Sequence, residues 1–232
     1  MDVVIETASA PAPSATNTSA HSSSPATPRP PSPTRWGDRD QRRADILTAG
    51  RRLLDGGGYS ALRMREVAKG AGISLGAVYR YYPNKESLFV ALHTRHLAAM
   101  MDDLDEQLRQ STGFVEAFTH FAAAYRTGFL AFGREFDAQN VMNDDAQVPA
   151  ALVDDLRAAI ARILRALHDT LTRFGYTGDY DRAMTLLWAS VSGLANHYAT
   201  ARAEFVAVDW DTAVSFAIST LARGLGLDPA RS

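Results

Sequence analysis

The sequence predicts an all-α protein, in which a small three-helix module near the N-terminus is followed by a larger helical bundle. Apolar residues recur at intervals of three and four over most of the chain after residue 34, which is the spacing of one helix face. No stretch has the alternation of apolar and polar residues that is typical of a half-buried strand. Hydrophobic residues make up 46% of the 232 residues, which is enough to form a core.

The first 34 residues differ in composition from the rest of the chain. They are mostly Ser, Thr, Pro and Ala, and they hold seven of the ten prolines. Such a stretch buries too little apolar surface to offset the entropy lost on ordering. We therefore expect a disordered tail over residues 1–34, the three-helix module over residues 35–88 and the bundle over residues 89–228.

The module is expected to begin with a helix whose apolar face carries Ile46, Leu47, Leu53 and Leu54. The three glycines of residues 56–58 end this helical pattern. Because no strand precedes them, we interpret them as a helix stop and not as a phosphate-binding loop.

A helix-turn-helix follows. Met64, Val67 and Ala68 share one face of its first helix, and glycines at 70 and 72 mark the turn. Ser74 is a suitable N-cap for the second helix, and Val78 is its inward anchor. In this motif the second helix lies in the major groove of DNA while the first crosses the backbone.

The same segment resembles the DNA-binding region of the TetR family of transcriptional regulators. The resemblance rests on Arg65–Ala68, Gly72–Ser74, Gly76, the run Val78–Tyr82, and then Asn84–Glu86 and Leu88. It implies a one-component regulator, most simply a ligand-released repressor, that binds a palindromic operator in double-stranded DNA as a homodimer. It also implies that the helical bundle holds a small-molecule site and the dimer interface.

The resemblance assigns Tyr79 and Lys85 to phosphate contacts and Tyr81 to the same hinge. The chemistry agrees, because a phenol can donate to a phosphate oxygen and a lysine at a helix start adds charge beside amides that already face the anion. Tyr82 corresponds to a buried aromatic position of the family. Packing of the module is the alternative role for Tyr79 and Tyr81, and a solvated ion pair is the alternative for Lys85.

Arg65 matches a position from which an arginine reaches a base edge or the backbone, and arginine with guanine is the commonest specific contact in the major groove. Arg63 departs from the threonine that the family often has, and Leu75 and Ala77 replace polar residues. Sequence readout therefore depends more on DNA shape. The predicted DNA-binding residues are Arg63, Arg65, Ser74, Leu75, Ala77, Tyr79, Arg80, Tyr81 and Lys85.

The distribution of charge supports this interpretation. The chain as a whole has a net charge of −2, but residues 35–97 carry a net charge of +6 and residues 98–232 a net charge of −7. A basic block followed by an acidic block suits a module that binds a polyanion, joined to one that does not.

The bundle begins with one continuous aromatic stripe at helical spacing, made of Phe114, Phe118, Phe121, Tyr125, Phe129, Phe132 and Phe136. Such a stripe is more often core than pocket, but the resemblance raises the pocket interpretation to an equal alternative. Leu156–Leu167 would form the facing wall, and a largely apolar or aromatic ligand would suit both. The predicted pocket residues are Phe118, Phe121, Tyr125, Phe129, Leu156, Ile160, Leu164 and Trp188.

The last two helices are expected to form the dimer interface, because two helices from each subunit would make a four-helix contact of the kind that the resemblance implies. Small residues around Gly193 would allow the helices to approach closely. The predicted interface residues are Met184, Val191, Leu194, Tyr198, Val214, Ile218, Leu221 and Leu225.

Other function classes have weaker support. His93 and His96 lie three apart, and acidic pairs occur at residues 144–145 and 154–155, but the Glu-x-x-His spacing of helical metal sites is missing. Cysteine is absent, and no apolar run is long enough for a membrane span. We expect a cytoplasmic protein that is not an enzyme, with no cofactor, no metal and no membrane partner. A constitutive DNA-binding protein with a filled core remains the alternative, and an all-helical enzyme is less favoured.

Overall fold

The computed structural model describes residues 35–133, 147–199, 205 and 207–227, with side chains from residue 39 onward. These residues form eight helices and no strand, so the predicted all-α class is confirmed. The tail predicted for residues 1–34, Phe136 and the acidic pair at 144–145 lie outside the described residues.

The N-terminal module consists of α1 (Arg35–Ala61), α2 (Met64–Gly70) and α3 (Leu75–Tyr81). As predicted, the helical backbone breaks at the glycines: Gly57 and Gly58 leave the helical conformation, and α1 consists of two helical stretches joined across this kink. Val67, Val78 and Tyr82 are at most 1% exposed, so they form the centre of this module. The hydroxyl of Ser74 accepts a hydrogen bond from the amide of Ala77 at 3.1 Å, as an N-cap of α3 should.

The long helix α4 (Lys85–Gln110) begins in the module and continues into the bundle. Its N-cap is Asn84, whose Oδ1 accepts from the amide of Ser87 at 2.7 Å. It packs against α1 at one end and against α5 (Phe114–Phe132) and α6 (Ala150–Arg173) along its length. One rigid element therefore joins the N-terminal module to the bundle.

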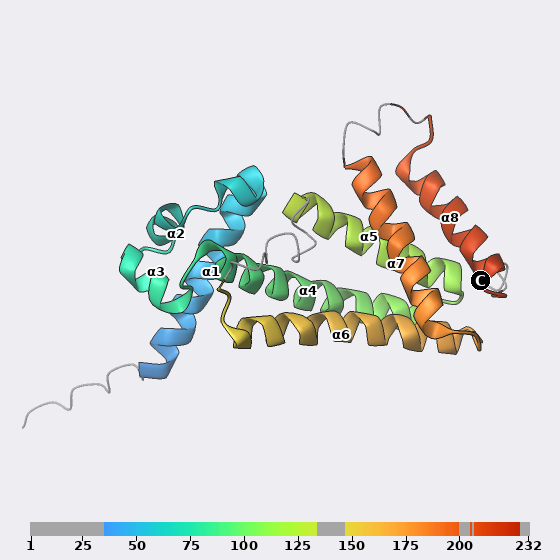
Figure 1. The fold of residues 1–232 in the computed structure, drawn as a ribbon, viewed down its shortest axis with the longest axis horizontal. Coiled ribbons are helices and arrows are strands. Elements are labelled where there is room, and N and C mark those ends of the chain that lie inside the picture. The colour runs from blue at the N-terminus through green and yellow to red at the C-terminus, as the bar shows by residue number, and fades with distance from the viewer. Residues whose placement is uncertain (1–34, 134–146, 200–204, 206, 228–232) are drawn as a thin grey trace, which may run out of the picture. The chain divides into compact units, whose positions relative to one another are not determined.

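The helices α4 and α6 run side by side in the same direction (Figure 1). The Arg162 guanidinium of α6 pairs with Asp102 at 2.8 Å and with Asp105. Further along, Arg173 donates to the carbonyls of Arg109 and Ser111, both at 3.0 Å, at the C-terminal end of α4. These bonds fasten the distal halves of the two helices to each other.

The helix α7 (Tyr180–Tyr198) packs against α5, α6 and α8 (Trp210–Gly224), and α8 also packs on α5. Asp179 and Asp209 cap α7 and α8, since each carboxylate accepts from the amide three residues on. No helix among the described residues is long and apolar enough to cross a membrane.

Candidate nucleic-acid interface and helical bundle

The helix α3 turns a set of polar and aromatic side chains outward while it buries Val78. Tyr79 is 47% exposed, and Ser74 and Arg80 are also exposed. A β-carbon added at Gly76 would meet nothing within 4 Å, so the helix presents open surface at this turn. A surface of this kind can lie against another molecule without displacing any part of the module.

The other residues predicted to contact DNA differ in how far their side chains are exposed. Arg63 and Arg65 of the α2 region are exposed, whereas Leu75, Ala77 and Tyr81 are half-buried. Arg63 is the N-cap residue of α2, but its side chain makes no capping hydrogen bond. The two arginines therefore have no structural role as helix caps that would compete with a role in binding.

Lys85 is half-buried at the first residue of α4, and its ammonium lies over the ring of Tyr59, 3.7 Å from the centroid. The Tyr59 hydroxyl donates to the carboxylate of Glu86 at 3.1 Å, and its ring meets Phe89 edge-on with the centroids 5.0 Å apart. The sequence analysis did not single out Tyr59, because its partners lie at the start of α4, with the whole helix-turn-helix between them in the sequence.

The hinge between the module and the bundle is joined to its surroundings by side-chain hydrogen bonds. The guanidinium of Arg43 donates to the hydroxyl of Tyr82 at 3.4 Å, and burial raises the pKa of this phenol despite that hydrogen bond. The side-chain amide of Asn84 donates to the carbonyl of Gln147 at 3.0 Å, just before α6 begins. The start of α4 thus contacts α1 on one side and the segment leading into α6 on the other.

A second junction lies where α1, α4 and the end of α5 meet. The Arg51 guanidinium donates to Nδ1 of His96 at 3.3 Å and lies 5.2 Å from the ring centroid of Phe132. His93 is 4% exposed and packs against the rings of Phe89 and Phe132, at centroid distances of 6.2 and 5.3 Å, and these two rings also contact each other at 5.7 Å.

Burial lowers the pKa of His93 to about 3, and burial together with the charge of Arg51 lowers the pKa of His96 to about 4. Among the described residues there is no group of three or more His, Cys, Asp or Glu side chains that could hold a metal ion. These two histidines therefore belong to an apolar, aromatic junction between the module and the bundle.

The aromatic stripe of α5 is buried and continuous. Phe114 stacks on Phe118 at 5.5 Å, Phe118 contacts Phe121 at 5.3 Å, and Phe121 contacts Tyr125 at 6.2 Å between centroids. Trp188 of α7 closes on this row, at 5.6 Å from Tyr125 and 6.2 Å from Phe121. The structure thus brings together the predicted Phe118, Phe121, Tyr125 and Trp188, and Phe129 is buried further along the same helix.

The predicted wall on α6 is only partly turned inward. Leu156 is buried and Ile160 is half-buried, but Leu164 is 41% exposed. The inward position in that turn belongs to Ile163, which is 2% exposed. Neighbouring residues on a helix differ in direction by about 100°, so only one of two adjacent apolar residues can face the core.

The residues predicted for the dimer interface divide by burial. Val191, Val214 and Ile218 are each 2% exposed, so they face the interior of the protomer. Met184, Leu194, Tyr198, Leu221 and Leu225 are half-buried. The hydroxyl of Tyr198 donates to the carbonyl of Val208 at 2.7 Å, so it holds the residues that lead into α8.

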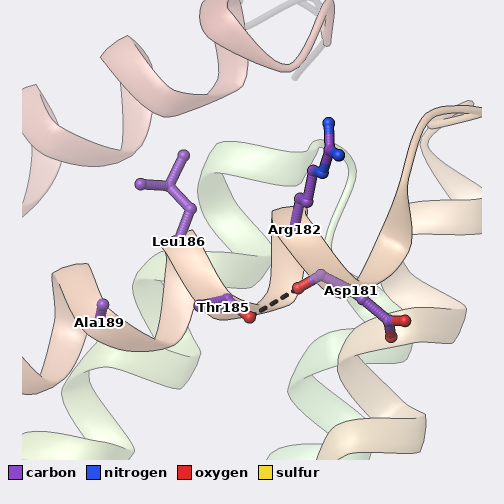
Figure 2. Close-up of a pocket in the computed structure, with 5 residues that line it drawn as sticks. All are labelled: Asp181, Arg182, Thr185, Leu186 and Ala189. Atoms are coloured by element: carbon purple, nitrogen blue, oxygen red, sulfur yellow. Dashed lines mark hydrogen bonds between the residues drawn. The ribbon is translucent and has the colours of Figure 1, made fainter.

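The outward faces of α7 and α8 carry two large apolar residues that sequence reasoning missed, Leu186 at 46% and Phe216 at 71% exposure. A hollow lies along α7, and Figure 2 shows the side chains that line it, with Leu186 projecting from the helix. Asp181, Arg182, Thr185, Leu186 and Ala189 line this hollow. The exposed side of α7 therefore carries both polar and apolar side chains.

Comparison with known families gives one match, to the model described as bacterial regulatory proteins of the tetR family, over residues 46–92. This range runs from the middle of α1 through the helix-turn-helix into α4, and it includes every predicted DNA contact. The match therefore covers the module that exposes the α3 surface.

Two curated relatives are similar to part of this chain. The transcriptional activator FasR of Mycolicibacterium smegmatis is 32% identical over 106 residues, which cover 42% of this chain and 48% of that protein. The transcriptional repressor KstR of Rhodococcus jostii is 44% identical over 55 residues, or 24% of this chain and 26% of that protein. The chain thus spans about half the length of these relatives or less.

Similarity of fold extends much further along the chain. The crystal structure of the regulator FadR from Bacillus subtilis in complex with stearoyl-CoA superposes with a TM-score of 0.56 at 16% identity, and the alignment covers 78% of this chain and 98% of that one. At this identity the likeness concerns the arrangement of the helices alone.

Proposed function

We propose that this chain, which belongs to the TetR family of DNA-binding transcriptional regulators, is a homodimeric repressor that leaves its operator when a small apolar or aromatic molecule binds in its helical bundle. The observation that carries the proposal is the outward surface of α3, with Tyr79 47% exposed above a fully buried Val78. Exposed polar and aromatic groups on a short helix at a basic module suit the major groove of DNA.

Lys85 supports the proposed mode of binding. It stands at the N-terminus of α4, where the helix amides and the lysine together favour a phosphate oxygen. Tyr79 and Lys85 would fix the protein on the DNA backbone, while Arg65 and the outer face of α3 read the bases. Readout by Leu75 and Ala77 would be limited to apolar contact with thymine methyl groups.

The proposed homodimer uses the outward faces of α7 and α8. Leu186 and Phe216 leave apolar surface exposed there, and Gly193 has open space above it. Burying these residues against the same surface of a second copy would remove apolar area from water and would form a symmetric four-helix contact. Two modules could then bind the two half-sites of a palindromic operator.

The proposed response to a ligand depends on α4. This helix carries Lys85 at one end and lies against the aromatic stripe of α5 along the rest. The hydrogen bond from Asn84 to Gln147 links the module to the segment that leads into α6, and the contact of Arg51 with the Phe132 ring links it to α5. A ligand that binds one arrangement of these helices better than the other would change the affinity for DNA by the same factor as DNA changes the affinity for the ligand.

The buried stripe of α5 and Trp188 supports an apolar or aromatic ligand, because it offers few polar partners. The stearoyl-CoA bound to FadR is an acyl chain on a protein of the same fold. The names of the relatives include both an activator and a repressor. Repression is the sign that we propose, since KstR is 44% identical over its 55 matched residues, whereas FasR is 32% identical over 106.

A constitutive DNA-binding protein is the second candidate, and the contacts between the rings of α5 favour it. Phe114, Phe118, Phe121 and Tyr125 already pack on one another and on Trp188, as in a filled core. The two functions differ in a simple experiment, in which DNA release is measured with stearoyl-CoA and with a set of small phenols. If one of these compounds releases the protein from DNA and raises its melting temperature, the ligand-released repressor is supported. If none of them changes DNA binding or the melting temperature, the constitutive DNA-binding protein is supported.

A further inference from the structure

We infer that Tyr59 is a positioning residue for DNA binding, whose ring holds the ammonium group of Lys85 at the start of α4. The inference rests on the proposed function, in which Lys85 contacts a phosphate of the DNA backbone. It concerns a residue at the end of α1, outside both helices of the helix-turn-helix.

The position of Lys85 explains why its charge needs support. It is the first residue of α4, where the unpaired amides give the helix end a partial positive charge. A cation at this end is disfavoured by the helix, although it is useful for binding a phosphate. The face of Tyr59 offsets this, because its π electrons attract an ammonium, and the nitrogen lies 3.7 Å from the ring centroid.

Two side-chain contacts and the preceding backbone fix the position of the Tyr59 ring. Its hydroxyl donates to Glu86 at 3.1 Å, and the edge-to-face contact with Phe89 fixes the plane of the ring, at an angle of 87° between the two rings. Gly58 precedes it with φ of 63° and ψ of −163°, a conformation that residues with a β-carbon avoid. Tyr59 therefore follows directly on the kink in α1, and its ring lies under the ammonium of Lys85.

A lysine that is held in this way loses less side-chain freedom when it binds DNA. An ammonium has three N–H donors, so a lysine that lies over a ring can still donate to an oxygen atom. The donation from the Tyr59 hydroxyl to Glu86 holds that carboxylate and increases the electron density of the ring, which strengthens its attraction for the ammonium. The ring thus prepares Lys85 for a phosphate and need not touch DNA itself.

The test is a double-mutant cycle on full-length protein with Tyr59→Leu, Lys85→Ala and the double variant. Affinity for a random-sequence duplex is measured by fluorescence anisotropy over a range of salt concentrations. We expect Tyr59→Leu to weaken binding by about two- to fivefold per half-site in the parent background, and not at all when Lys85 is already alanine. Tyr59→Phe and Tyr59→Trp keep an aromatic face and should retain the affinity of the parent within about twofold.

The outcomes separate this inference from the proposed function. A Lys85→Ala protein that binds as tightly as the parent would overturn both. If Lys85→Ala weakens binding but Tyr59→Leu causes the same loss in both backgrounds, only the role of Tyr59 is overturned. If Tyr59→Leu does not fold, the test is an NMR measurement on the parent protein. The ring current of Tyr59 should shift the ε-methylene protons of Lys85 upfield, and unshifted protons would contradict the inference.

Discussion

His93 should make the stability of this protein strongly dependent on pH on the acid side of neutrality. The side chain is 4% exposed and packs against the rings of Phe89 and Phe132, and burial lowers its pKa from 6.5 to about 3. Between these two values the unfolded chain binds a proton at this position and the folded protein does not. Stability therefore falls as the pH falls, and it is fully present only above pH 6.5.

The size of this loss follows from the two pKa values. Each pH unit between them costs about 1.4 kcal/mol, so lowering the pH from 7.5 to 4.5 should remove about 3 kcal/mol through His93 alone. His96 acts in the same direction, because its pKa is lowered to about 4, but it is less buried and its share is smaller. A total stability of about 5–15 kcal/mol, as is common for a folded domain, makes this a large fraction.

The assay is urea unfolding of the parent and of His93→Leu at a series of pH values between 7.5 and 4.5. Subtracting one curve from the other cancels the carboxylates common to both, and the variant should lose about 3 kcal/mol less over this range. Leu92→Met is the matched control, since it changes packing on the same helix without removing a titrating group. If His93→Leu and the parent lose stability in parallel, His93 is not held neutral by burial and the reasoning fails.

Three further predictions concern the proposed function. Removing residues 1–34 should leave the melting temperature unchanged, and a fall of several degrees would show that the tail contributes to the fold. Phe216→Glu should dissociate the dimer in sedimentation and weaken operator binding, because it places a charge in the proposed apolar contact, whereas the control Thr119→Glu, at an exposed position of α5, should have a smaller effect. Ala124→Trp should abolish the response to ligand and keep DNA binding if it fills a cavity, while a loss of about 1–3 kcal/mol of stability would indicate a core already full.

The N-terminal module could be predicted well from the sequence because its signals are local. The cap at Ser74, the inward Val78 and the buried Tyr82 all lie within a few residues of one another, and each has a fixed place in the short helices. The spacing of the α5 aromatics likewise follows from the helix repeat and is found as a buried row.

Other features depend on contacts between helices, which a single helix pattern does not specify. Ile163 and Leu164 fit the same apolar stripe, and only the packing of α6 on α4 decides that Ile163 is buried. For the same reason Val214 faces inward, whereas Phe216, two residues further on, faces outward. The contact of Tyr59 with Lys85 joins the end of α1 to the start of α4 and has no signature in either segment alone.

The most direct test of the proposed function is to select bound sequences from a random duplex library with the purified full-length protein. Two copies of the α3 surface in a symmetric dimer predict enrichment of one inverted repeat, with its half-sites about one helical turn apart or a multiple of that distance. An Arg65→Ala variant should lose preference at defined positions within each half-site. No enriched sequence, or a single unrepeated half-site, would contradict the account of a dimeric DNA-binding regulator.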